Sequence, residues 1–186
     1  DLMIIMQALG RGLVPEAYLF GLVMPGQLLA LCGSPAQQAR WLAPLLEGEH
    51  QLALAWQEHA ARYDAFDIST HARQHNGQWL LNGRKDVVMN LANAAATLVT
   101  AQLPNGQLGV FIVPADAQGV SQRTYRTMDD QPAGDLMLDD VALPLHHRRQ
   151  GRANGAPLPH QVDVDAAFEL LGVDRQQRVG RRRNPR

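Results

Sequence analysis

The fold is decided by two nearby stretches of the chain, LALAWQEHAARYD at Leu52–Asp64 and GQWLLNGRKDVVMN at Gly77–Asn90. At the start of the first stretch, larger apolar residues alternate with smaller ones, which is the period of a half-buried β-strand. Asn76-Gly77 opens the second stretch, and Asn-Gly between two strand-like runs is a strong hairpin signal. We therefore expect a strand and then a hairpin in this part of the chain.

Helical patterns precede this stretch and strand patterns follow it. Residues 2–13 and 17–32 carry apolar side chains at helical spacing, and Ser34-Pro35-Ala36-Gln37 has the residues of a capping box. Two further Asn-Gly pairs, Asn82-Gly83 and Asn105-Gly106, predict additional turns. Strands are expected over residues 97–103, 108–113, 120–126 and 135–138. This order predicts an α+β fold, with N-terminal helices followed by an antiparallel, barrel-like β-domain.

Three parts are predicted along the chain. Residues 1–50 are the end of an N-terminal helical domain, residues 51–145 are the middle β-domain, and residues 146–186 are a loop and a disordered, arginine-rich tail. The last twelve residues hold six arginines and no acid, whereas residues 1–174 hold 11 basic and 18 acidic side chains. Such a tail has few apolar residues to fold around. Because the chain also begins without Met, we expect a piece of a longer protein.

Composition and spacing exclude several classes of protein. No apolar run approaches the roughly 20 residues that cross a bilayer. The single cysteine, Cys32, excludes an internal disulfide framework and favours a reducing, cytoplasmic setting. His71 and His75 fall in a strand pattern, so we interpret them as solvated residues rather than metal ligands. Asp129-Asp130 and Asp139-Asp140 are interpreted as turn residues rather than catalytic carboxylate pairs.

A series of short motifs runs through residues 1–144. The motifs are Gly12-Leu13-Val14-Pro15-Glu16, Gly33-Ser34, Gln37, Trp41-Leu42, Gly48-Glu49, Ala55–Glu58, Arg62-Tyr63-Asp64, Asn82-Gly83-Arg84-Lys85 and Gly119-Val120. In this order and spacing the chain resembles the acyl-CoA dehydrogenase family, and within it the pimeloyl-CoA dehydrogenase small-subunit branch. The resemblance implies FAD as cofactor, an acyl-CoA substrate, electron-transfer flavoprotein as redox partner, and a homo- or hetero-oligomeric full protein.

The resemblance also implies where the cofactor and substrate lie. The expected cofactor-binding residues are Trp56, Gln57, Val88 and Met89, and the residue expected beside the acyl-CoA is Tyr63. The family usually has Thr in place of Gln57, and its segment Lys-x-Trp-Ile-Thr-Asn here reads KDVVMN at residues 85–90. This segment therefore lacks the usual aromatic wall and hydroxyl. The family's catalytic carboxylate lies in a C-terminal helical bundle that the resemblance does not reach, so no catalytic residue is assigned.

Three functions stay open on these grounds. The first is a part of an FAD-dependent acyl-CoA dehydrogenase, which oxidises the Cα–Cβ bond of a fatty or dicarboxylic acyl thioester and is inactive as this chain alone. The second is a non-catalytic subunit or interaction module, favoured by the exchanges at Gln57, Val87 and Met89. The third is a nucleic-acid binder; it depends on Arg175–Arg186 alone, and because those residues are interpreted as a disordered end, no nucleic-acid partner is expected.

Overall fold

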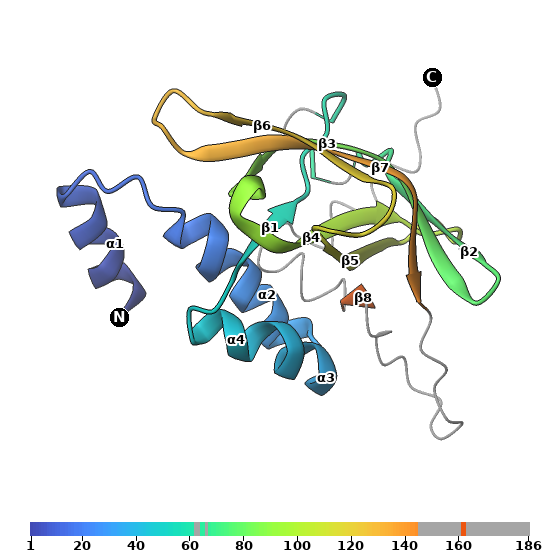
Figure 1. Cartoon of the computed structure of the whole chain (residues 1–186), viewed down its shortest axis with the longest axis horizontal. Coiled ribbons are helices and arrows are strands. Elements are labelled where there is room, and N and C mark those ends of the chain that lie inside the picture. Colours follow the sequence, from blue (N-terminus) through green and yellow to red (C-terminus); the bar gives the residue numbers. More distant parts are fainter. Residues whose placement is uncertain (62–63, 66, 145–160, 163–186) are drawn as a thin grey trace.

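A computed structural model of the chain describes residues 1–61, 64–65, 67–144 and 161–162 (Figure 1). Helices come first and a curled sheet follows, so the predicted α+β class is confirmed. The helical segments are α1 (Leu2–Arg11), the π-helix η1 (Leu19–Val23), α2 (Met24–Cys32), α3 (Pro35–Gln37), the π-helix η2 (Gln38–Leu42), α4 (Ala43–Leu46) and the 3-10 helix η3 (Leu91–Asn93). The strands are β1 (Gln51–Ala55), β2 (His71–His75), β3 (Gln78–Met89), β4 (Ala94–Gln102), β5 (Leu108–Pro114), β6 (Val120–Arg126), β7 (Pro132–Pro144) and β8 (Gln161–Val162).

The sheet has the strand order β6-β7-β3-β2-β4-β5-β8, and β1 pairs with β4 beside this path. Its neighbours are antiparallel except for β1 with β4 and β2 with β4, which run parallel. β3 runs antiparallel to β2 in their hairpin, and β4 then runs in the same direction as β2. The sheet is therefore mixed, whereas the sequence pattern predicted an antiparallel set.

The Asn-Gly pairs do not all form turns. Asn76 and Gly77 have φ angles of 49° and 73° and join β2 to β3, as predicted. Asn82-Gly83 was expected to do the same but lies inside β3, so this prediction is wrong. Gly83 has φ of 148°, and a Cβ there would lie 2.5 Å from the Thr70 hydroxyl. Glycine is needed at this position because another segment approaches it closely.

One other local prediction is corrected by the strands. Asp139-Asp140 lies inside β7 rather than in a turn, and Asp140 accepts a hydrogen bond from the side chain of Asn82. The capping box is confirmed, since Gln37 donates its backbone N–H to Ser34 and accepts one in return.

Two apolar clusters hold the elements together. Inside the curl of the sheet, Trp79 of β3 meets Phe111 of β5 edge to face, with ring centroids 5.4 Å apart. The second cluster joins α2 and α4 to the outer side of the sheet; it contains Leu28, Leu29, Cys32, Trp41, Leu45, Leu52, Leu98 and Ile112. Each fully buried Leu, Ile or Phe contributes about 1.5–3 kcal/mol. These clusters fix α2 against β1, the place where the candidate site lies.

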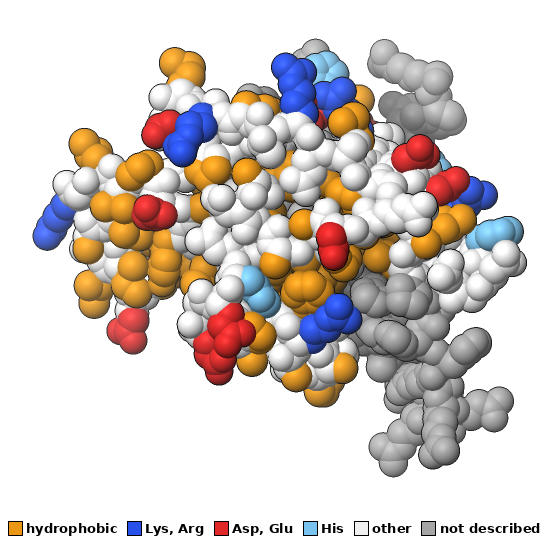
Figure 2. All heavy atoms as spheres, in the orientation of Figure 1, with side chains coloured by type: hydrophobic (Ala, Val, Ile, Leu, Met, Phe, Trp, Pro, Cys, Tyr) orange, Lys and Arg blue, Asp and Glu red, His pale blue; other side chains and the backbone are white. Residues whose placement is uncertain are grey.

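Helix α1 differs from the other helices because none of its residues is buried. Figure 1 shows it set apart from the sheet, and Figure 2 shows apolar side chains gathered over it. The exposed apolar residues include Leu2, Met3, Ile4 and Ile5. The amphipathic pattern of residues 2–13 thus predicts the helix, but within the described part of the chain its apolar stripe is not covered.

The remaining expectations concern the histidines, the membrane and the C-terminal part. His71 and His75 are both exposed on β2, and the described residues include no group of three metal-ligating side chains. None of the described helices is long and apolar enough to cross a membrane. Most of the predicted loop and tail, residues 146–160 and 163–186, lies outside the described residues. The exception is β8, which pairs with β5 through Val162 and Val110.

Candidate functional site

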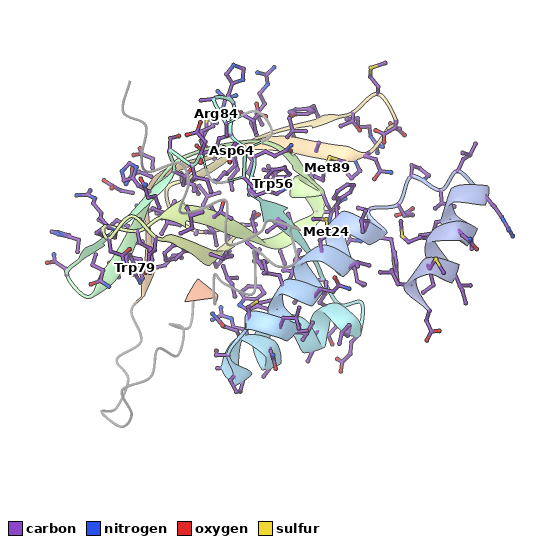
Figure 3. All side chains as sticks on the ribbon, turned by 180° about the vertical axis from the view of Figure 1, so that it is seen from behind. Met24, Trp56, Asp64, Trp79, Arg84 and Met89 are labelled. Atoms are coloured by element: carbon purple, nitrogen blue, oxygen red, sulfur yellow. The ribbon has the colours of Figure 1, made fainter. Side chains whose placement is uncertain are left out.

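A cavity of about 300 Å³ lies between the helices and the sheet. Its lining residues are Phe20, Met24, Leu54, Trp56, Gln57, Val87 and Met89. Figure 3 shows the side chains of Met24, Trp56 and Met89 coming together from α2 and the sheet, while Trp79 lies at the opposite end of the sheet. The volume is at the lower end of the range for small-molecule sites.

Three segments of the chain position these side chains. Phe20 in η1 and Met24 at the start of α2 are four residues apart, so they share one helical face. Leu54 near the end of β1 and Trp56 just beyond it share one side of an extended segment. The third segment is the end of β3, which supplies Val87 and Met89. Three of the four predicted cofactor residues, Trp56, Gln57 and Met89, are therefore brought together.

A β-bulge decides which valine of β3 reaches the cavity. The register of β3 against β7 shifts between Lys85 and Val88, and Val87 has φ of 52°, an outlier for a β-branched residue. Regular alternation from the inward-pointing Lys85 would bury Val87 and turn Val88 outward. The bulge reverses this, so Val87 is 45% exposed and lines the cavity, while Val88 is 2% exposed and lies in the core. The structure thus places the predicted cofactor residue Val88 away from the cavity.

Gln57 brings a carboxamide to an otherwise largely apolar cavity. Within the described residues, its side chain makes no hydrogen bond, whereas its backbone oxygen accepts one from the N–H of Asp86 at 3.0 Å. A free amide can donate and accept hydrogen bonds at the polar edge of a ligand. The half-buried Trp56 adds an aromatic surface beside it. This donor set suits a flat ring system with polar atoms at its edge, which is the form of a flavin ring. Tyr63, the predicted substrate residue, lies outside the described residues.

Next to the cavity-lining Gln57 in the sequence, Glu58 forms an ion pair with Lys85 that is closed off from solvent. Lys85 Nζ lies 2.7 Å from Glu58 Oε1, and the two side chains are 0% and 4% exposed respectively. Lys85 also donates to Thr100 Oγ1 at 3.0 Å. Glu58 accepts further hydrogen bonds from the backbone N–H and hydroxyl of Ser69 and from the N–H of Thr70. These partners satisfy both charges, which is the condition for keeping an ion pair inside a protein.

The surroundings keep both groups charged at neutral pH. Burial alone would raise the pKa of Glu58, but hydrogen bonds from Lys85, Ser69 and Thr70 and the positive charge of Lys85 lower that pKa to about 2. Burial lowers the pKa of Lys85 to about 8, although Glu58 counteracts part of this change. The pair is therefore a carboxylate and an ammonium at pH 7.

A second group of polar and charged side chains lies on the solvent side of the bulge. Arg84 contacts Asp86 at 2.7 Å and Asp135 at 3.0 Å, and its own side chain is 58% exposed. Tyr125 donates its hydroxyl to Asp135 at 3.0 Å. Burial and this hydrogen bond to the Asp135 carboxylate raise the pKa of Tyr125. Sequence reasoning identified neither set of charges, because their members come together only in the fold.

Comparisons with known proteins identify relatives of this chain. Residues 53–141 match the family model described as acyl-CoA dehydrogenase, middle domain. The acyl-CoA dehydrogenase FadE12 of Mycobacterium tuberculosis (strain ATCC 25618 / H37Rv) is 29% identical over 126 residues, which are 64% of this chain and 32% of that protein. Subunit CarC of the caffeyl-CoA reductase-Etf complex of Acetobacterium woodii is 30% identical over 161 residues, 81% of this chain and 42% of that protein.

A solved structure shows the same fold. The crystal structure of an acyl-CoA dehydrogenase complexed with FAD from Bacillus anthracis superposes with a TM-score of 0.59 at 30% identity, over 63% of this chain and 21% of that chain. The chain spans about a third of the length of the first curated relatives that it matches. The matched region contains the strands that form the sheet side of the cavity. The comparisons support the acyl-CoA dehydrogenase family for this chain, through the middle-domain match of residues 53–141.

Proposed function

We propose that this chain binds FAD in the cavity between α2 and the sheet and forms the flavin-facing part of an acyl-CoA dehydrogenase. The observation that carries the proposal is the cavity itself. It joins apolar walls from three segments to a carboxamide, that of Gln57, whose side chain makes no hydrogen bond within the described residues. A polar group that faces a mostly apolar pocket is the usual means of orienting a bound ring. The FAD seen in the B. anthracis relative is consistent with this ligand.

The chain's own residues would hold the ring and keep water away from it. Trp56, Val87 and Met89 supply apolar surface on the sheet side, and Gln57 offers its amide to a polar atom at the edge of the ring. FAD, when bound, supplies the acceptor for the hydride that leaves the β-carbon of an acyl thioester. Holding the ring in one orientation fixes the direction from which the substrate must approach. Removal of the α-proton is assigned to no residue of this chain.

The substrate and partners of the proposed enzyme follow from the family resemblance. The substrate is an acyl-CoA thioester of a fatty or dicarboxylic acid, such as pimeloyl-CoA, with Tyr63 beside the acyl chain. Electron-transfer flavoprotein is the proposed redox partner, supported by the relative from A. woodii that is a subunit of an Etf complex. Homo- or hetero-oligomer formation is supported by the exposed apolar residues of α1. We propose that this chain by itself has no dehydrogenase activity.

A second function is favoured by two residues of the cavity. Val87 and Met89 stand where the family usually has an aromatic wall and a hydroxyl, and both line the cavity. A non-catalytic subunit that keeps the fold and supports a partner's active site would tolerate these exchanges. The two functions differ in flavin content, because only the first requires the cavity of this chain to bind FAD.

Flavin retention tests the proposed function directly. The purified chain is incubated with FAD and passed through a desalting column, and its visible absorption spectrum is recorded. We expect protein-bound flavin absorbance, with about fivefold weaker binding in Gln57→Leu, because one hydrogen bond contributes about 1 kcal/mol. Gln78→Leu is the matched control, since Gln78 is exposed at the start of β3. Absence of bound flavin in the unsubstituted chain would contradict the proposal and favour the non-catalytic subunit.

A further inference from the structure

We propose that the buried Glu58–Lys85 pair, with Ser69, Thr70 and Thr100, is a positioning clamp that sets where Gln57 and the β3 bulge stand in the cavity. The inference rests on the proposed function, because it assigns positioning residues to the proposed flavin site. None of the clamp residues lines the cavity. They act through the two neighbours in sequence that do line it, Gln57 beside Glu58 and Val87 two residues after Lys85.

The inference rests on the contacts between the Trp56–Gln57 segment and β3, which both line the cavity. Beyond the end of β1 at Ala55, the segment with Trp56 and Gln57 is no longer part of a strand ladder. Two contacts tie this segment to β3: the backbone hydrogen bond from Asp86 N–H to Gln57 oxygen at 3.0 Å, and the ion pair at 2.7 Å. The residues of the two contacts are neighbours in sequence: Gln57 precedes Glu58 on one segment, and Lys85 precedes Asp86 on the other. Moving Glu58 therefore moves the Gln57 side chain relative to the bulge.

Other segments meet at the same buried charges. Glu58 accepts the backbone N–H groups of Ser69 and Thr70 at 2.7 and 3.0 Å, which fixes the chain just before β2. Lys85 donates to Thr100 of β4, and the Thr100 hydroxyl lies 3.4 Å from the backbone oxygen of Ala55. The ion pair thus joins the end of β1, the start of β2, β3 and β4 at one point. Directional hydrogen bonds fix these segments more closely than apolar contact alone.

A role in positioning explains why charges are kept in this core. Buried ion pairs add little net stability compared with well-packed apolar side chains, because removing two charges from water is costly. Lys85 is the only lysine among the 17 Lys and Arg residues of the chain. A compact ammonium with three donors can reach Glu58 and Thr100 together, whereas a planar guanidinium requires more space. Charge here contributes geometry, and an apolar pair of similar volume would avoid an unpaired buried charge while losing that geometry and the Glu58 acceptor of the Ser69 and Thr70 N–H groups.

The decisive variant replaces both charges at once. Glu58→Leu/Lys85→Met keeps an apolar filling but removes every hydrogen bond made by the two charged side chains of the clamp. We expect its urea midpoint to recover most of the loss seen in Lys85→Met, while the amide of Asp86 exchanges with deuterium at least tenfold faster than in the unsubstituted chain. Asp86 is the reporter because its amide bonds Gln57 and not a clamp side chain. The FAD dissociation constant, measured by equilibrium dialysis, should rise at least tenfold.

Two further variants complete the test. Arg73→Met breaks the exposed Arg73–Asp140 pair, which is not part of the clamp, and is expected to change neither exchange at Asp86 nor FAD affinity. Ser69→Ala keeps the ion pair and removes one hydrogen bond to Glu58, so a smaller acceleration of exchange at Asp86 is expected. This variant replaces the double variant in the test if the double variant does not fold. Unchanged exchange at Asp86 in the folded double variant, or in Ser69→Ala if the double variant is unfolded, overturns the clamp. Because exchange is measured without FAD, failure of the unsubstituted chain to bind FAD would contradict the proposed function and leave the clamp testable.

Discussion

Arg84 and Lys85 are neighbours on β3, and each has a carboxylate at 2.7 Å, yet they occupy opposite environments. Lys85 is 0% exposed and its partner Glu58 is 4% exposed, whereas Arg84 is 58% exposed and its partner Asp86 is 13% exposed. Water screens the outer pair and competes for its hydrogen bonds, so a short distance there carries little energy. The inner pair has no solvent to replace a lost partner. Burial, rather than the distance between the charged atoms, therefore decides how much each pair contributes to stability.

Removing one member of the inner pair is expected to have the largest effect. Lys85→Met leaves the Glu58 carboxylate buried without its counter-charge, which should lower the free energy of unfolding by about 3–5 kcal/mol. Urea denaturation followed by circular dichroism measures this loss. A loss below about 1 kcal/mol would show that Glu58 reaches water or another partner once Lys85 is gone, and the contrast with Arg84 would disappear.

Acid should lower the free energy of unfolding through the inner pair, which stays ionised in the folded chain until the pH approaches 2. The pKa of Glu58 is about 2 in the folded chain against 4.5 ordinarily, so its contribution is fully present above about pH 4.5 and is lost as the pH falls towards 2. The loss amounts to about 3 kcal/mol across that interval. Lys85 adds no slope there, because its pKa of about 8 lies well above the interval. Urea midpoints from pH 6 to pH 3 should fall steeply in the unsubstituted chain and more gently in Glu58→Gln; parallel curves would contradict this assignment.

Gly83 allows the inner side to be disturbed without removing a charge. In Gly83→Ala the new Cβ would approach the Thr70 hydroxyl, and alanine rarely adopts φ of 148°. We expect a loss of about 1–3 kcal/mol, because Thr70 must move and its amide bonds Glu58. Gly77→Ala is a control for positive φ, since nothing lies within 4 Å of a Cβ at that turn. Equal losses in the two variants would mean that backbone strain alone explains the effect and that close packing on Thr70 does not contribute.

The smallest effect is expected on the solvent side of the bulge. Arg84→Met removes both ion pairs of Arg84 and should lower the free energy of unfolding by less than about 1 kcal/mol. That difference should shrink further in high salt, because exposed charges are screened. A loss as large as that of Lys85→Met would reverse the comparison and would make Arg84 a main support of the bulge.

The two pairs Asn76-Gly77 and Asn82-Gly83 show which features of the fold could be predicted from the sequence. Local patterns predicted the helices, the strands and the turn at Asn76-Gly77, because alternation and turn chemistry act over a few residues. Asn82-Gly83 has the same two residue types but lies within β3, since the approach of Thr70 from another segment decides the conformation of Gly83. The prediction of a turn from this pair was wrong for that reason.

The candidate site was only partly predictable because a bulge and distant partners shape it. Family resemblance indicated Trp56, Gln57 and Met89, which do line the cavity. It placed Val88 there as well, but Val87 takes that position through a positive φ that a valine rarely adopts. The inner ion pair joins residues 27 positions apart, so no local sequence pattern indicates that the two charges meet.

We propose that FAD binding in the cavity depends on the surface formed by Trp56 and Gln57. Equilibrium dialysis of FAD against the unsubstituted chain, Trp56→Ala and Arg73→Met measures this dependence. We predict saturable binding at one site, weakened at least tenfold, or about 1.4 kcal/mol, by loss of the Trp56 ring and unchanged when the exposed Arg73 pair is broken. Binding that does not saturate, or that is equal in Trp56→Ala and the unsubstituted chain, would contradict the claim.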